Sequence, residues 1–386
     1  MPRRELGVDV LTAAYDRIHR LYKEGHRLVV SFSGGKDSTC ILELCVMAAR
    51  ETNRLPVEVV MRDDEIMLPG TFEYAERTAN REEIDFHWLV AGQPVINIFN
   101  RQAPYFWVFD EQLPEEELVR PFPTHPSVER IYELNIQAMC TDKRFPVDAD
   151  AGQKLYSVMG LRTAESPNRR MAIYNTKGYL TIHKTKWGVY GCRPIYDWSD
   201  KDVWKFIKDC KLDYNEAYNV MYRMGVKRNK LRIGPPTMNR AGMHHLKIAM
   251  QAWPRWFDRV SKRCPGVRTA AQYGKHSVSP TRKLGETWED CYKRVCINEA
   301  PEWIAERARI YMGDMLRLNA NVSTSPIPEV TGNLRLGQVN NWRQMTMVMY
   351  NGDPFLTAAS NSSRLKVVEP EFFRAGAGKW GGSPSF

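Results

Sequence analysis

The chain has 386 residues, 43% of them apolar, which is enough for two or three domains with substantial cores and excludes a disordered protein. No apolar run reaches membrane-spanning length and the N-terminus lacks the apolar stretch of a signal peptide, so we expect a cytoplasmic protein without membrane contact. A formal net charge of +10 with a pI near 9.1 predicts an anionic partner, either a nucleotide or a nucleic acid.

The first half of the chain alternates between strand and helix patterns. An amphipathic helix starts behind Asp9, and short apolar runs follow that are typical of buried strands. We expect strands at 28–32, 57–61, 86–90, 156–161 and 179–183, with helices at 37–50, 69–80 and 199–210. This order predicts an α/β fold with a doubly wound, mostly parallel five-stranded sheet.

Changes in composition divide the chain into three parts. We expect an α/β domain at 1–213, with a helical insertion at about 93–154 that contains prolines and an aromatic run. Beyond residue 213 the strand patterns stop, and we expect a basic, mainly helical domain at 214–318. Residues 319–386 are rich in Asn, Ser, Gly and Pro, which predicts an irregular C-terminal tail.

A glycine-containing turn joins the first expected strand to the next helix. Its residues are Ser33, Gly34, Gly35, Lys36, Asp37 and Ser38. Glycines adopt backbone angles that are closed to other residues, so several N–H groups can converge on one anion at the positive end of the helix dipole. Lys36 adds a full charge and the serines add hydroxyl donors. The turn therefore predicts a phosphate site.

The run SGGKDS after a strand resembles the PP-loop of the adenine nucleotide alpha hydrolase-like superfamily. That group includes ATP pyrophosphatases, adenylating sulfur-transfer enzymes and phosphoadenosine phosphosulfate (PAPS) reductases. The resemblance implies that residues 1–213 bind ATP or a related adenine nucleotide, with residues 33–38 on its phosphates. It also implies catalytic roles for Lys36, Asp37 and Arg162.

Two later segments are similar to PAPS reductase-like proteins. The first, from Gly160 to Arg170, leaves a strand end, where ligands of parallel sheets bind. The resemblance implies that its Arg162 and Arg169 contact phosphate or sulfate, although a solvated basic turn would have the same composition. The second, from Pro194 to Trp204, is interpreted as mainly structural, with side chains that cap and flank a helix.

Asp63 follows the second expected strand and is similar to the aspartate near the adenosine in reductase relatives, although Asp64 and Glu65 replace the usual Thr-Gly. Because Mg²⁺ prefers carboxylate and phosphate oxygens, Asp37 and Asp63 are candidate Mg²⁺ ligands.

Two chemistries compete within this superfamily. A sulfonucleotide reductase uses a nucleophilic cysteine near its C-terminus, and this chain has no cysteine after Cys296. The turn also keeps Lys36 and Asp37, as in relatives that cleave ATP between the alpha and beta phosphates. Residues 225–230 replace the paired cysteines of many relatives, so we expect no iron–sulfur cluster. We therefore expect ATP cleavage with pyrophosphate release and adenylation of an acceptor, in sulfur transfer or nucleic-acid modification.

Two alternatives stay open, a PAPS reductase and a non-catalytic nucleotide-sensing transcriptional coregulator. The second arises because segments between 232 and 288 look like those of a PAPS reductase-like family in phages and prophages, typified by the immunoglobulin-binding regulator A coregulators. Such a protein would also have a partner protein.

Two basic stretches, 223–232 and 255–268, contain or adjoin aromatic residues and suit nucleic-acid binding. A solvated helix face explains them equally well.

Overall fold

The computed structural model describes residues 7–91, 94–131, 140–174, 181–185, 188–237, 243–274, 279–330, 339–356 and 358–374. The chain forms two compact units. Unit 1 comprises Met1–Gln93, Trp107–Pro235 and Gln251–Trp256, and unit 2 comprises Pro94–Phe106, Pro236–Met250 and Phe257–Phe386. The expected domain boundaries after residues 213 and 318 stay a prediction. The division into compact units does not test which parts of the chain fold alone.

Unit 1 is built on a 7-stranded sheet with the strand order β6-β3-β2-β1-β7-β9-β8. Its strands are β1 (Arg27–Phe32), β2 (Val57–Arg62), β3 (Ile84–Ala91), β6 (Val128–Ile131), β7 (Leu155–Val158), β8 (Ile182–Lys184) and β9 (Tyr190–Cys192). Every neighbouring pair is parallel except β8 with β9. The α/β fold with a mostly parallel sheet is confirmed.

The sheet has two more strands than expected, β6 and β9. Both are short, and β6 is only partly buried, so neither forms the apolar run by which a strand is recognised in a sequence. The strand expected at 179–183 falls partly outside the described residues, and its described part belongs to β8.

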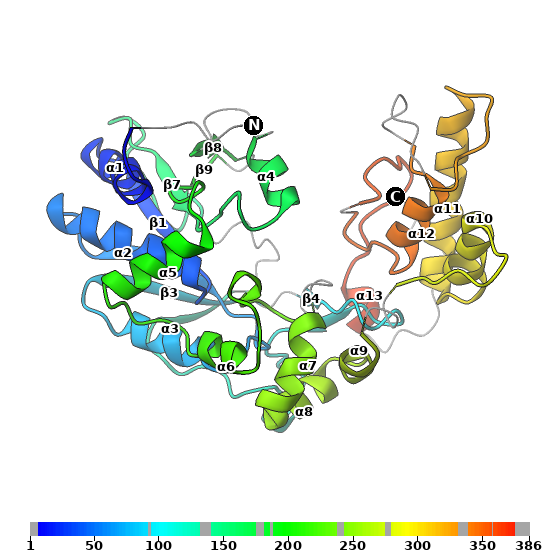
Figure 1. The fold of residues 1–386 in the computed structure, drawn as a ribbon, viewed down its shortest axis with the longest axis horizontal. Helices are drawn as coiled ribbons and strands as arrows, with labels where there is room; N and C mark the ends of the chain where they lie inside the picture. Colours follow the sequence, from blue (N-terminus) through cyan, green and yellow to red (C-terminus); the bar gives the residue numbers. More distant parts are fainter. Residues whose placement is uncertain are drawn as a thin grey trace. The chain divides into compact units, whose positions relative to one another are not determined.

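One face of the sheet is covered by helices. They are α1 (Val10–Lys23), α2 (Lys36–Glu51), α3 (Thr71–Ala79) and α5 (Asp200–Asp209). Figure 1 shows α1, α2 and α5 beside one another, and α2 contacts both of its neighbours. Residues of these helices share one core with alternate residues of β1 and β2, such as Val30 and Val59. On the opposite face Val29 and Val60 pack with Phe145. Both faces of the sheet are thus packed, so the loops at the ends of its strands start from a rigid base.

The helical insertion expected at 93–154 is not found in the residues that can be described there. Residues 94–131 and 140–154 contain β4 (Pro94–Ile96), β5 (Tyr105–Trp107), β6 and the 3-10 helix η1 (Glu115–Glu117), and no α-helix. Prolines explain the difference, because each removes a backbone donor and disfavours a helical conformation in the residue before it.

Unit 2 is mainly helical, which confirms the helical C-terminal region. Its larger helices pack around a core that contains Tyr292, Tyr311 and Met345. The helices are α9 (Val267–Tyr273), α10 (Trp288–Tyr292), the π-helix η5 (Lys293–Asn298), α11 (Glu302–Ala320), α12 (Trp342–Met349) and α13 (Glu371–Arg374); α7 (Met243–Ala252) and α8 (Pro254–Arg263) belong partly to each unit. Among the described residues, none of the helices is both long and apolar enough to cross a membrane.

Candidate functional site

The glycine turn follows β1, the strand from which the chain builds the sheet outward in both directions. Strand β1 pairs with β2 on one side and β7 on the other, so the loops that leave β1 and β7 emerge together at the carboxyl edge. Gly34 has a φ of 68°, and a Cβ added there would lie 2.9 Å from Thr71 Cγ2. A Cβ on Gly160 would lie 2.8 Å from the Asp37 carbonyl carbon. The loops after β1 and β7 therefore meet at backbone distance at Gly160, which leaves no room for a side chain there. At Gly34 the positive φ is what favours glycine.

Side chains from the turn itself, from Asn215 and from α6 (Ala217–Arg223) hold the turn in shape. Ser38 Oγ accepts hydrogen bonds from the amides of Gly35 (3.1 Å) and Ser33 (3.3 Å) and donates to the Gly35 carbonyl (2.8 Å). The Lys36 amide donates to the hydroxyl of buried Tyr218 at 2.9 Å. Asn215 Nδ2 donates to the Gly34 carbonyl at 3.2 Å. These contacts fix the backbone of the turn.

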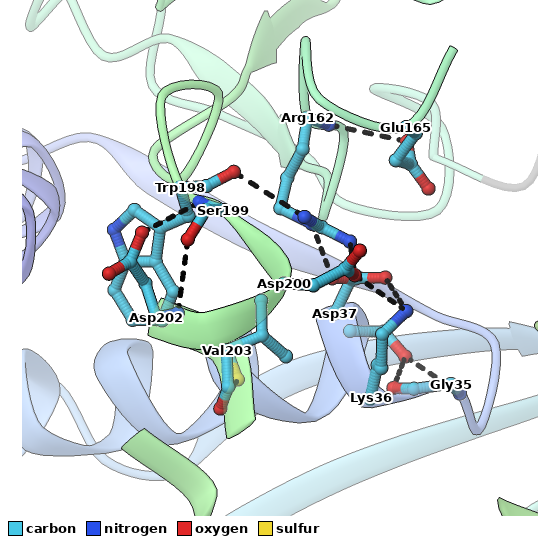
Figure 2. Close-up of polar contacts among 12 residues, drawn as sticks. Gly35, Lys36, Asp37, Arg162, Glu165, Trp198, Ser199, Asp200, Asp202 and Val203 are labelled. Carbon is cyan, nitrogen blue, oxygen red and sulfur yellow. Dashed lines mark hydrogen bonds and ion pairs between the residues drawn. The ribbon is translucent and has the colours of Figure 1, made fainter. Parts of the chain in front are cut away.

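Four charged side chains form a network at the start of α2. Arg162 Nε donates to Asp37 Oδ1 at 2.6 Å, and Arg162 Nη2 donates to Asp200 Oδ1 at 3.0 Å. Lys36 Nζ lies 3.0 Å from Asp37 Oδ2 and 3.9 Å from Asp200 Oδ1. Figure 2 shows the two carboxylates between the two cations. We refer to these four residues as the α2 network.

The α2 network is balanced in charge, with buried cations and partly exposed carboxylates. Lys36 and Arg162 are 4% and 1% exposed. Burial alone would lower the pKa of Arg162, but Asp37 and Asp200 outweigh it and raise that pKa, so the guanidinium stays charged. Arg162 Nη1 also approaches the Trp198 carbonyl at 3.4 Å. Two cations thus meet two carboxylates, and an incoming anion has to compete for Lys36.

A cavity of about 270 Å³ opens beside this network within unit 1. The turn lines one side and the β7 loop the other, with Arg169, Arg232 and Tyr218 at its wall. Arg169 is exposed and lies 3.2 Å from Glu165, and Arg232 donates to the Glu165 carbonyl. The full lining is Ser31, Ser33, Gly35, Lys36, Asp37, Ser38, Met159, Gly160, Leu161, Glu165, Arg169, Tyr218, Arg232 and Ile233.

Asp63 lies at the end of β2 and is fully buried. Its carboxylate accepts hydrogen bonds from Trp88 Nε1 (2.9 Å), from the Glu65 amide (2.8 Å) and from Arg120. These contacts hold the β2 end in place and occupy both oxygens of Asp63. Within the part of the chain that can be described, no group of three or more potential ligands could hold a metal. The expected Mg²⁺ site at Asp37 and Asp63 stays a prediction.

Most of the expected nucleotide-binding residues lie together. The turn residues other than Gly34 line the cavity together with Arg169. Arg162 lies in the network beside Asp37, and Asp63 is held by Trp88 and Arg120. Asp200 is a residue that the sequence reasoning missed, although it belongs to the segment from Pro194 to Trp204 and is a carboxylate in the first turn of a helix.

Asn215 and Tyr218 were also missed, and Arg232 was expected only as part of the basic stretch 223–232. Nothing in the sequence around these residues points to the turn, and only the folded chain places them beside it.

Comparisons with known proteins agree with this arrangement. The phosphoadenosine phosphosulfate reductase domain family matches residues 27–225, which contain β1, the turn, the β7 loop and α6. The chain is also 26% identical over 384 residues to a protein of Escherichia coli (strain K12) named "Uncharacterized protein YbdN", a match that covers 92% of this chain and 91% of that protein. The expected likeness to phage coregulators stays a prediction.

Solved structures give weaker likenesses. FMN adenylyltransferase from Candida glabrata is 15% identical with a TM-score of 0.35, and the match covers 54% of this chain and a little over half, 57%, of that chain. A PAPS reductase from Candida auris is 12% identical with a TM-score of 0.30, over 61% of this chain and 97% of that chain. Scores this low support no conclusion about the present chain.

The family match spans more than half of the chain and includes the turn and all of the cavity lining except Arg232 and Ile233. The chain therefore belongs to the phosphoadenosine phosphosulfate reductase domain family.

Proposed function

We propose that this protein binds ATP with its phosphates in the cavity beside the turn and cleaves it at the alpha phosphate. Pyrophosphate leaves and an acceptor is adenylated. The observation that carries the proposal is that the turn, Lys36, Arg169 and Arg232 line the same cavity at the carboxyl ends of β1 and β7. Backbone donors and cations aimed at one small cavity suit a polyphosphate.

The proposed roles follow from position. The amides of Asp37 and Ser38 lie in the first turn of α2, where no earlier helical carbonyl is available to them, so they can donate to phosphate oxygens. Lys36 neutralises the departing pyrophosphate, and Arg169 and Arg232 approach the phosphates from the opposite wall. An acceptor oxygen attacks the alpha phosphorus, a new P–O bond forms, and the bond to the bridging oxygen breaks with its electron pair leaving on pyrophosphate. Positioning and charge neutralisation supply the catalysis.

Arg162 has a positioning role in this proposal, instead of the direct phosphate contact that the resemblance implied. Its guanidinium already donates to Asp37 and Asp200, and the side chain is only 1% exposed. Of the two candidate Mg²⁺ ligands, Asp37 lines the cavity, and we propose it as the carboxylate that meets Mg²⁺ brought by the nucleotide. The ion would neutralise phosphate charge there.

The cysteines favour ATP cleavage over sulfonucleotide reduction. All except Cys210 are buried. Burial raises the pKa of Cys140 and of Cys192 to about 12, and raises that of Cys40 well above its usual value. These thiols stay protonated at neutral pH, whereas a reductase needs a thiolate.

The test is incubation with ATP labelled at the alpha phosphate, with Lys36→Ala as the variant and Lys205→Ala as the control. Lys205 is an exposed lysine of α5 that pairs with Asp209, outside the cavity lining. We expect labelled AMP or an adenylated product from the wild type and from Lys205→Ala, and a loss of about 100-fold or more in pyrophosphate release for Lys36→Ala. Undiminished release by Lys36→Ala would reject the proposal, and ATP that is bound but unchanged would indicate a sensor.

A further inference from the structure

The two basic stretches differ in how many of their charged side chains have partners within the protein. The first follows α6 and includes the 3-10 helix η3 (Arg228–Lys230). Its residues Arg223, Lys227, Arg228 and Lys230 are all exposed, and none of them forms an ion pair with any described residue. The chain has no aspartate or glutamate between Glu216 and Asp258. These four charges are therefore available to an outside partner.

In the second stretch, 255–268, several charged side chains contact carboxylates or aromatic rings of the protein. Lys262 Nζ lies 2.8 Å from Asp258 and Arg268 Nη2 lies 2.9 Å from the same carboxylate. The guanidinium of Arg268 also lies 5.7 Å from the centre of the Phe257 ring, and that of Arg263 lies 5.5 Å from the centre of the Phe106 ring. Charges held by a carboxylate and by ring faces contribute less to binding a distant polyanion.

The first stretch also carries an exposed aromatic ring. Tyr222 is 52% exposed, and the Arg228 guanidinium lies 5.4 Å from the centre of its ring. A flat ring beside unpaired cations is the combination with which proteins bind single-stranded nucleic acids, because a base can stack while the cations meet phosphates. A duplex, whose bases are already stacked, would gain nothing from the ring.

The same segment leads directly to the cavity. After Lys230, the Leu231 carbonyl lies 3.4 Å from Lys36 Nζ, and the next two residues, Arg232 and Ile233, line the cavity. A strand that follows the exposed cations would reach the proposed phosphate site without leaving the segment. A cavity of about 270 Å³ admits a chain end or a single extruded group but not a duplex.

We propose that the exposed set of Tyr222, Arg223, Lys227, Arg228 and Lys230, here called the basic arm, binds single-stranded nucleic acid and directs it toward the cavity. Its use as the adenylated acceptor rests on the proposed function. Binding itself does not, because the basic arm lies outside the turn and needs no ATP. DNA and RNA share the chemistry recognised here, phosphates and base faces, and the probes described next distinguish them.

The experiment measures fluorescence anisotropy of labelled oligo(dT), oligo(U) and a duplex of equal length with the full chain, without ATP, over a series of salt concentrations. The arm variant changes Arg223, Lys227, Arg228 and Lys230 to Gln. The control variant removes the same number of charges from the second stretch, changing Arg255, Arg259, Lys262 and Arg268 to Gln. Tyr222→Ala removes the ring and leaves every charge in place.

We expect the arm variant to bind the preferred single strand at least about tenfold more weakly and to flatten its log–log salt slope by about 3, as lost phosphate contacts require. The control variant keeps most of the affinity, Tyr222→Ala weakens binding with an unchanged salt slope, and the duplex binds less tightly than the single strand. Circular dichroism and the melting temperature of each variant should match the wild type, because the changed residues are on the surface.

Equal losses in the arm and control variants would overturn the proposal. So would tighter binding of the duplex, or competition by polyglutamate as strong as that by unlabelled oligonucleotide, which would indicate an acidic protein as partner. Binding by the basic arm together with intact ATP would leave this inference standing and remove the proposed function. ATP cleavage without oligonucleotide binding would do the reverse.

Discussion

Each unit of the molecule contains a carboxylate that is bound by charged side chains, and the one in unit 1, Asp37, lines a cavity. In unit 1, Asp37 and Asp200 bind Lys36 and Arg162. In unit 2, Asp314 of α11 is 1% exposed and binds Ser362, Arg317 and Arg364. We refer to the second group as the Asp314 network.

The surroundings of the two networks explain the difference. The α2 network adjoins a helix N-terminus, a turn with two glycines and the cavity. Asp314 lies in the middle of a 19-residue helix and ties it to residues 362–364. A buried ion pair is thus no mark of a functional site by itself, because backbone donors and open space beside it decide whether a ligand can use the charge.

The largest difference should come from removing one arginine of each network. Arg162→Met removes a fully buried guanidinium and leaves the partly buried Asp37 and Asp200 with Lys36 as their remaining cation, so we expect it to destabilise the protein by about 3 kcal/mol. Arg364→Met should cost about 1 kcal/mol, because the Arg364 side chain is 48% exposed and Asp314 keeps Ser362 and Arg317 as partners. Urea denaturation measures both. Equal losses of unfolding free energy in the two variants would contradict the expected difference between the two networks.

A matched pair of glycines tests the backbone contact. In Gly160→Ala the new Cβ would lie 2.8 Å from the carbonyl carbon and 2.9 Å from the carbonyl oxygen of Asp37, and neither backbone atom can give way. We expect a destabilisation of about 2 kcal/mol and at least about tenfold weaker ATP binding. In Gly313→Ala, next to Asp314, the contact is the flexible end of Arg364 at 2.9 Å. That change should be nearly neutral, because alanine also favours the helix.

Calorimetry with ATP and a thermal melt of each glycine variant provide the measurements. If Gly160→Ala bound ATP as tightly as the wild type, the close approach of the two loops would have no part in the site.

How much of this could be predicted from the sequence depends on whether a feature is local. Apolar runs and the glycine turn are local, and they were sufficient to predict the parallel sheet, the position of the turn and the part of the cavity lining that the turn supplies. The partners of Lys36 and Gly34 are not local, since Tyr218 and Asn215 are more than a hundred residues away and nothing in their own neighbourhood marks them.

Asp63 shows another limit of local patterns. Its place after a strand and its resemblance to reductase relatives suggested a nucleotide or Mg²⁺ ligand, which stays a prediction, whereas its contacts to Trp88 and Arg120 depend on packing that a sequence pattern does not contain.

The Asp314 network should show a distinct response to acid. Burial alone would raise the pKa of Asp314, but hydrogen bonds from Ser362 and Arg364 outweigh it and hold that pKa below its ordinary value of 3.8. A lowered pKa in the folded state stabilises the protein above the ordinary value, and this stability is lost as the pH falls through the folded pKa. The difference in unfolding free energy between the wild type and Asp314→Asn should therefore shrink below about pH 4. A difference that stayed constant down to pH 3 would contradict this.

The smallest expected effect compares one hydroxyl in each unit. Tyr218 accepts from the Lys36 amide at 2.9 Å, and burial raises its pKa, so the hydroxyl keeps a proton that it can donate into the cavity it lines. Tyr218→Phe should therefore cost about 1 kcal/mol of stability and also weaken ATP binding several-fold. Tyr311, whose hydroxyl accepts from Asn340 at 2.6 Å, lies in the helical core of unit 2. Tyr311→Phe should cost about the same stability and leave ATP binding unchanged.

Calorimetry with ATP on the two phenylalanine variants, at matched thermal stability, separates the two roles of a buried tyrosine. A change in affinity confined to Tyr218→Phe means that its hydroxyl belongs to the ligand site as well as to the fold, because loss of a purely structural hydrogen bond would lower stability in both variants and affinity in neither. If both variants bound ATP as the wild type does, the Tyr218 hydroxyl would be structural like that of Tyr311, and the anion would be held by the turn, Lys36 and the two arginines of the opposite wall alone.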